Sequence, residues 1–195
     1  AGLQEVHGPQ AQALENQYAA KWGMYPASGK AQNRVIWDRN EWEQTDGRLV
    51  DIPYFGGKDV GMPLVQLTST TTGQVIWVWS IHNPANTQGN AAGHRQEALR
   101  RQLATMTELA GAGTPAVILG DFNDGPEAAT TQILYGPAGS QPRGPIDATH
   151  ASGAFQSPDQ ADPRRLFNVT KLVAEDIRWS RRHNGQNELL DHILA

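Results

Sequence analysis

An aspartate and an asparagine stand one residue apart just after an apolar run, and their side chains could do chemistry together. The run covers residues 115–119, and Asp121 and Asn123 follow it. Alternate residues of a strand point to the same side, so both side chains can leave the end of a buried strand together. Carboxylate and amide oxygens placed in this way suit a hard cation and a phosphate group. The spacing therefore predicts a metal-assisted hydrolase.

Four other polar residues occupy comparable places, each beside an expected strand end. Glu5 lies in the expected strand end at residues 3–6, His82 and Asn83 stand at the end of a long apolar strand, and Asp191 lies in the last expected strand. An imidazole at the end of a buried strand suits the floor of a cleft, where it can act as an acid or base. Each residue alone also has an ordinary structural interpretation, such as a surface glutamate, a hydrogen-bonded histidine, an Asx-rich turn or a strand-end aspartate.

The elements that must hold these residues follow from the hydrophobic period. Residues 74–82 are apolar on both faces, which places them inside a layered fold, and Thr71 to Gly73 predict a hairpin turn before them. Strands mixed with helices, without an internal repeat, favour an α/β sandwich over a regular βαβ winding. The expected strands cover residues 3–6, 34–37, 63–70, 74–82, 115–119 and 189–194, and the expected helices cover residues 9–20, 93–110 and 127–135.

Two of the expected helices are amphipathic. The first carries Ala13, Leu14 and Tyr18 on its apolar side. The apolar positions of the second are spaced four, three and four residues apart, at Leu99, Leu103, Met106 and Ala110. His94 and Arg95 fall in the first turn of this second helix, where they could reach the cleft, although a helix turn exposed to solvent is the simpler expectation.

Composition limits the classes of protein that remain. The 195 residues are 38% hydrophobic, which is enough for one sizeable core and predicts a single domain over residues 1–195. A net charge of -4 excludes a basic architectural DNA-binding protein. The absence of cysteine excludes a disulfide framework and leaves the compartment open. No apolar run reaches membrane length and the first residues do not resemble a signal peptide, so we expect a soluble chain and a monomer.

Four motifs, in this order, resemble the endonuclease/exonuclease/phosphatase superfamily, whose members are similar to DNase I. They are Leu-Gln-Glu-Val at residues 3–6, Ser-Ile-His-Asn-Pro at 80–84, Gly-Asp-Phe-Asn at 120–123 and Leu-Asp-His-Ile at 190–193. Residues 33–43 also look like the family's strand and following turn. The resemblance implies a four-layer α/β/β/α sandwich, incomplete at its N- and C-terminal strands. It also implies a divalent-metal-dependent phosphodiester hydrolase, first of all a nuclease.

The resemblance implies a role for each candidate residue. Glu5 matches the glutamate that holds Mg²⁺ or Mn²⁺, and His82 the histidine that assists at the scissile phosphate. Asp121 matches the aspartate that orients or deprotonates the attacking water. Asn123 matches the amide that holds a phosphate oxygen, and Asp191 the aspartate that pairs with a later histidine. The remaining candidate is Asn83, which we expect to contact the substrate.

Three departures from the family pattern affect these expectations. The family has an asparagine on a strand before the first motif and a Ser-Asp-His segment after the last, and neither occurs between Ala1 and Ala195. We therefore expect a domain cut at both ends, with incomplete activity. The acidic residue that often precedes the strand of Trp37 is also missing. Gln32 or Asn33 takes its place, which leaves the partner of His82 open.

Two classes of function remain open from the sequence. One is a metal-dependent phosphoesterase acting on DNA, RNA, a lipid headgroup or a small phosphoester. The other is a catalytically incomplete binding module of the same fold. Of the six tryptophans, Trp37, Trp77 and Trp79 fall in strand runs and are expected in the core. The basic residues at 178–183 could contact a phosphate backbone, although a solvated loop is the simpler interpretation.

Overall fold

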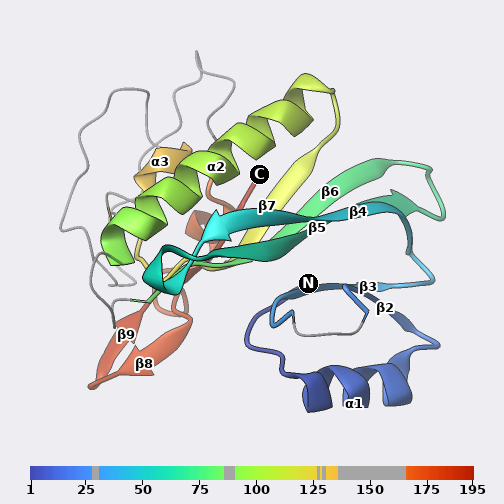
Figure 1. Ribbon diagram of the computed structural model, residues 1–195, viewed down its shortest axis with the longest axis horizontal. Helices are drawn as coiled ribbons and strands as arrows, with labels where there is room; N and C mark the ends of the chain where they lie inside the picture. Colours follow the sequence, from blue (N-terminus) through green and yellow to red (C-terminus); the bar gives the residue numbers. More distant parts are fainter. Residues whose placement is uncertain (28–30, 86–90, 127, 129–130, 136–165) are drawn as a thin grey trace.

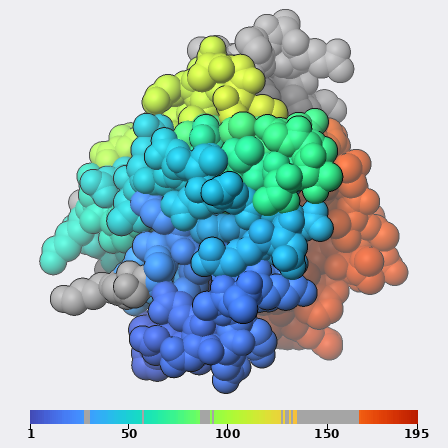
Figure 2. All heavy atoms as spheres, turned by 90° about the vertical axis from the view of Figure 1, so that its right-hand side faces the viewer, coloured from blue at the N-terminus to red at the C-terminus, as the bar shows by residue number. Residues whose placement is uncertain are grey.

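A computed structural model describes residues 1–27, 31–85, 91–126, 128, 131–135 and 166–195. Two β-sheets stack face to face, and each is covered by a helix on its outer side (Figure 1). Figure 2 shows the same order from the side, from the blue N-terminal residues through the cyan and green strands to the yellow-green second helix. The predicted α/β/β/α sandwich is therefore confirmed.

The smaller sheet contains three antiparallel strands in the order β1 (Gly2–Leu3), β3 (Arg34–Asp38) and β2 (Trp22–Tyr25). β1 is shorter than expected, and β2 lies outside the strands expected from the sequence. Helix α1 (Gly8–Tyr18) covers this sheet. The expected apolar side of α1 is partly wrong, because Ala11 is its buried residue, whereas Ala13 and Tyr18 are exposed.

The larger sheet contains five strands in the order β10-β7-β6-β5-β4. Only the β6–β7 pair is parallel. β6 is central, as its two apolar faces predict. The sequence patterns missed β4, because it is an edge strand whose many exposed polar residues mask the alternation. The strands span Trp42–Pro53 (β4), Asp59–Ser69 (β5), Val75–His82 (β6), Ala116–Asp121 (β7) and Asp191–Leu194 (β10).

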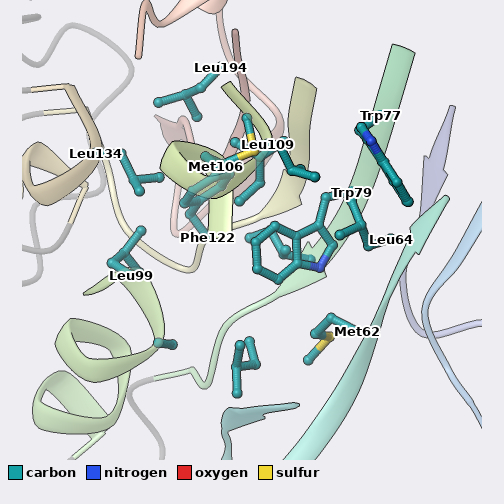
Figure 3. Close-up of a cluster of buried hydrophobic side chains, with 14 residues drawn as sticks. Met62, Leu64, Trp77, Trp79, Leu99, Met106, Leu109, Phe122, Leu134 and Leu194 are labelled. Atoms are coloured by element: carbon teal, nitrogen blue, oxygen red, sulfur yellow. The ribbon is translucent and has the colours of Figure 1, made fainter. Parts of the chain in front are cut away.

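The main core lies between this sheet and helix α2 (Ala91–Gly111). Met62 and Trp79 from the sheet and Leu99 and Met106 from the helix are among its buried side chains (Figure 3). The helix prediction is confirmed except at its end, where Leu109 is buried and Ala110 is exposed.

A second apolar cluster joins the two sheets. Val35 and Trp37 from β3 pack with Val65 and Leu67 from β5, with smaller contributions from partly buried neighbours. Trp77 and Trp79 are buried as well, so the expectation that three tryptophans belong to the core is correct. Because each sheet packs on the other, the ends of their strands are held in fixed relative positions.

No helix among the described residues is long and apolar enough to span a membrane.

Short elements complete the described part of the chain. Of the predicted helix 127–135, the described residues show α3 at its end. The proline-rich residues 136–165 lie outside the described residues. The short elements are η1 (Phe55–Gly57), α3 (Gln132–Tyr135), η2 (Val169–Leu172), β8 (Arg181–His183) and β9 (Gln186–Glu188).

Candidate active site

Three of the candidate residues meet at one edge of the larger sheet because of strand register. β6 and β7 run parallel with His82 opposite Asp121. β10 runs antiparallel to β7 with Asp191 opposite Asp121. The Nε2 atom of His82 lies 3.8 Å from Oδ2 of Asp121. The parallel pairing thus brings together two residues that are far apart in the sequence.

The Asp121 carboxyl group is in an environment that disfavours its charge. Burial raises its pKa to about 7, and the negative charges of Asp191 and Glu5 act in the same direction. The backbone N–H of Asn123 donates to Oδ1 at 2.8 Å, and this bond and the charge of Arg181 oppose the rise. A carboxyl group with a pKa near neutral can accept a proton at physiological pH, as a general base must.

The ring of His82 is oriented by a residue that the sequence did not indicate. The Tyr54 hydroxyl oxygen lies 3.3 Å from Nδ1 of His82. Burial, with the charges of Glu5 and Asp121, raises the pKa of Tyr54 to about 12, so it stays protonated and can donate to Nδ1. The other ring nitrogen then carries the hydrogen and directs it toward Asp121. Burial also lowers the pKa of His82, which favours the neutral ring.

Tyr54 is therefore the partner of His82 in this structure, in place of the missing acidic residue. Asn33, one of the two residues considered for that place, is buried and its amide contacts the sulfur of Met62. Tyr54 follows β4 directly, and β4 was not predicted. A sequence signal for its role would have required that strand to be recognised.

A hydrogen bond joins the two asparagines of the site. The Asn123 amide donates to the backbone oxygen of Asn83 at 2.6 Å. Asn83 is fully buried and its side-chain oxygen accepts from Gln102 of α2 at 3.0 Å. Asn123 adopts a left-handed backbone conformation, with φ 54°, which asparagine tolerates better than most residues. Asn83 is therefore held through both of its oxygens, whereas its side-chain nitrogen has no hydrogen-bond partner among the described residues, and its expected contact with substrate stays a prediction.

Glu5 reaches this edge from the other sheet. The amide of its neighbour Gln4 donates to the Ser80 hydroxyl of β6 at 2.9 Å, which holds the segment in place. Gly120 permits the approach, because a Cβ there would lie 2.1 Å from a backbone oxygen of β6 and 2.8 Å from the Gln4 amide. A hollow of about 300 Å³ beside these residues is also lined by Asp191. Glu5 itself is exposed.

A buried polar network supports the loop after β7. Arg95 of α2 bonds to the Asp124 carboxylate at 2.8 Å and to the Pro84 carbonyl at 2.8 Å. Arg95 and Asp124 are fully buried, so the expectation that Arg95 is exposed is wrong. His192 Nε2 donates to the Asp124 carbonyl at 2.9 Å and Nδ1 faces the Asn168 amide. Burial lowers the pKa of His192 to about 4, which keeps it neutral.

The carboxylates of the site suit a divalent cation by their chemistry. Glu5 and Asp191 both raise the pKa of Asp121, a repulsion that a cation would relieve. No group of three or more acidic or histidine residues in the described ranges forms a ready coordination cluster. Mg²⁺ usually binds through one or two carboxylates together with water and phosphate oxygens, so these residues fit such an ion.

Comparison with known proteins agrees with the fold. Similar solved structures include the human Nocturnin catalytic domain with bound sulfate (16% identity, TM-score 0.62), D. rerio TDP2 complexed with a single-strand DNA product (13%, 0.66) and a mannosyl-6-phosphatase of Bacteroides thetaiotaomicron VPI-5482 (12%, 0.67). Each comparison covers 99% of this chain and 67%, 68% and 69% of the respective structure.

Sequence comparison identifies the family. No curated protein matches this chain significantly. The sequence model of the Endonuclease/Exonuclease/phosphatase family matches residues 1–195, from the first residue to the last. The chain spans about two thirds of the length of the similar structures. Together with the four-layer fold, this match shows that the chain belongs to the endonuclease/exonuclease/phosphatase family.

Proposed function

We propose that this chain is the catalytic part of a divalent-metal-dependent phosphodiester hydrolase, first of all a nuclease. The observation that carries the proposal is the pair formed by Asp121 and His82. Burial raises the pKa of the carboxyl group to about 7, and the group lies 3.8 Å from His82 Nε2, which carries the ring hydrogen when Tyr54 donates to Nδ1. A base and a hydrogen-bond donor thus stand side by side at the edge where Glu5 and Asp191 add negative charge.

Each residue then has a defined task. Asp121 orients the attacking water and accepts its proton, and Asn123 donates an amide hydrogen to a phosphate oxygen. Tyr54 keeps the Nε2 hydrogen of His82 directed at the cleft, where it stabilises charge on the leaving oxygen. Glu5 is the first candidate to hold Mg²⁺ or Mn²⁺. Such an ion, when bound, supplies stabilisation of negative charge on the phosphate.

The similar structures support the reaction class and leave the substrate open. One is a complex of TDP2 with a single-strand DNA product, and another is a mannosyl-6-phosphatase. Both names refer to phosphoester chemistry, so we extend that chemistry to this chain. DNA or RNA is our first proposal for the substrate. A lipid headgroup or small phosphoester is the alternative.

The test is hydrolysis of plasmid DNA and bis(p-nitrophenyl) phosphate with Mg²⁺ or Mn²⁺, by this chain and by a version extended at both ends. Asp121→Asn removes the charge without changing volume, so we expect at least a 100-fold loss of turnover, about what one strong electrostatic group contributes. Thermal unfolding should show that the variant is folded. The matched control is Asp46→Asn, which changes an exposed carboxylate on β4.

The outcomes separate the two classes of function. Metal-dependent turnover that is lost in Asp121→Asn and kept in Asp46→Asn supports the proposal, whether it occurs in both chains or in the extended chain alone. Turnover that survives in Asp121→Asn would overturn the role of Asp121. Inactivity of both chains toward both substrates would favour the binding module.

A further inference from the structure

The β8–β9 hairpin is a basic element with a defined conformation next to the candidate site. Its two turn residues, Asn184 and Gly185, have φ values of 48° and 80°, as in the two-residue turns that suit tight hairpins. The hairpin extends from the rest of the molecule beyond the end of the sheets (Figure 1). The hydrolysis proposed above assigns no contact with substrate to any residue of this hairpin.

The base of the hairpin is attached to the strand that carries Asp191. The Ser180 hydroxyl accepts hydrogen bonds from the backbone N–H of Leu190 at 3.0 Å and of Asp191 at 3.3 Å. The Ser180 backbone N–H in turn donates to the Glu188 carbonyl. Asp191 stands opposite Asp121 in the sheet. Ser180 is therefore held close to the candidate site, and β8 begins at the next residue, Arg181.

The two faces of the hairpin carry different side chains. Register places Arg181 opposite Glu188 and His183 opposite Gln186, and these four side chains share one face. Arg182 points to the other face. The hydrogen bonds of Ser180 to the β10 end place Arg181, the next residue, near the site, and the charge of Arg181 accordingly lowers the pKa of Asp121. Arg181 and His183 are separated by about 7 Å along the strand.

The Arg181 face presents hydrogen-bond donors to solvent. Glu188 is mostly buried and binds Arg181 through Nε, which fixes the direction of the guanidinium group while about half of the side chain stays exposed. Arginine in a fixed orientation is well suited to phosphate. His183 and Gln186 are exposed beside it. Trp179, just before the hairpin, is 44% exposed and offers an aromatic surface.

We propose that the face of the β8–β9 hairpin formed by Arg181, His183 and Gln186 binds a second phosphate group of the substrate, next to the scissile phosphate at Asp121. The proposal rests on the function proposed above and narrows it to substrates with at least two phosphate groups. A single-stranded nucleic acid fits best, because its phosphates repeat along the chain and its bases can stack on Trp179.

The test compares two substrates in matched variants. Arg181→Gln combined with Glu188→Gln removes the ion pair without leaving a buried charge unpaired. Arg182→Gln removes the same charge from the opposite face. We expect the double variant to raise KM for a single-stranded oligonucleotide by about tenfold, the size typical of one lost phosphate contact. Bis(p-nitrophenyl) phosphate has one phosphate, so its kcat/KM reports only the effect of Arg181 on the pKa of Asp121. The loss of kcat/KM for the oligonucleotide should exceed the loss for this substrate by about tenfold, and Arg182→Gln should change both values by less than about twofold.

A direct measurement separates this proposal from the proposed function. Fluorescence anisotropy of the labelled oligonucleotide, with EDTA present, reports binding even if the chain hydrolyses nothing. About tenfold weaker binding by the double variant than by Arg182→Gln supports the subsite. Equal binding by the two variants, or an equal loss of kcat/KM for both substrates, would overturn it. Competition by a nucleoside triphosphate as strong as that of the oligonucleotide would assign the second phosphate to a nucleotide instead of a strand.

Discussion

The chemistry of Asp121 depends on opposing influences that act on one carboxyl group. Burial and the nearby carboxylates disfavour its charge, whereas the Asn123 backbone N–H and Arg181 favour it. His82 places Nε2 of its ring 3.8 Å from Oδ2 of Asp121, and burial lowers the pKa of His82, which favours the neutral ring. A carboxyl group under these opposing influences changes protonation near neutral pH. This property suits a general base, but it lowers the stability of the fold once the group is charged.

The first residue-scale prediction concerns the orientation of His82. Tyr54→Phe removes the hydroxyl group that lies 3.3 Å from Nδ1 and leaves the packing of the ring. With one hydrogen bond lost, we expect kcat to fall about five- to tenfold and the free energy of unfolding to change by less than about 1 kcal/mol. Steady-state kinetics and urea unfolding measure the two effects. Tyr18→Phe, at a residue that is 48% exposed, is the control. An unchanged kcat in Tyr54→Phe would exclude an orienting role.

The second residue-scale prediction concerns pH and stability without added metal. The pKa of Asp121 is raised on folding from an ordinary value near 4 to about 7, so the folded state holds this proton more tightly. The resulting stability is present below pH 4 and is lost as pH rises through 7. Its upper limit is about 4 kcal/mol, from about 1.4 kcal/mol per pKa unit. His82, whose pKa is lowered, acts in the opposite sense.

Comparison with Asp121→Asn isolates the contribution of Asp121. Urea unfolding between pH 5 and pH 8 with EDTA present should show that the wild type loses stability relative to this variant as pH rises. Asp46→Asn, the exposed carboxylate, should follow the wild type. Parallel curves for wild type and Asp121→Asn would contradict the environment described for this carboxyl group.

At the scale of elements, the sequence predicted those whose hydrophobic pattern is strong. The apolar runs of β6 and β7 and the period of α2 were found, and with them the residues at their ends. β4 and β2 were missed, because exposed polar residues in the first and glycine beside a loop in the second weaken the pattern. Tyr54 was missed for a different reason, and the basic residues at 178–183 were considered only for contact with a phosphate backbone. The positions of Tyr54 beside His82 and of Arg181 near Asp121 arise from tertiary packing, which local patterns do not contain.

Helix α2 has a role at this scale that its amphipathic pattern did not predict. Arg95 binds Asp124 and the Pro84 carbonyl, so one side chain connects the loop after β6 with the loop after β7. Gln102, about two turns further along, holds Asn83 in the first of these loops. The helix that covers the sheet therefore also fixes the spacing of His82 and Asp121 through the loops that follow them.

The element-scale prediction compares two ion pairs of α2. Asp124→Asn removes the carboxylate charge that lies 2.8 Å from Nε of the fully buried Arg95, and we expect a loss of about 3 kcal/mol in the free energy of unfolding. Asp59→Asn breaks the pair of Arg101 with Asp59, also short at 3.0 Å but exposed, and should cost less than about 1 kcal/mol. Urea unfolding measures both variants. Similar losses of unfolding free energy in the two variants would show that burial does not determine how much the Arg95–Asp124 pair stabilises the fold.

At the scale of the whole molecule, the site depends on the packing of one sheet on the other. Asp121 and Asp191 belong to the five-stranded sheet, whereas Glu5 follows a strand of the three-stranded sheet. The two parts approach where Gly120 lacks a side chain and the Gln4 amide contacts Ser80. A ligand that binds carboxylates from both sheets would therefore stabilise the sandwich as well as the local loops.

The last prediction uses this dependence on both sheets. Mg²⁺ or Mn²⁺ at about 100 times its dissociation constant should stabilise the folded chain by about 2.7 kcal/mol, seen as a higher Tm. Glu5→Gln should remove most of this shift, because it removes the proposed ligand, and Asp121→Asn should reduce it by removing a neighbouring negative charge, whereas Asp46→Asn should retain it. A shift that persists in Glu5→Gln and disappears in Asp121→Asn would place the ion on the five-stranded sheet alone. That result would contradict the role of Glu5. The three-stranded sheet would then contribute no ligand to the metal.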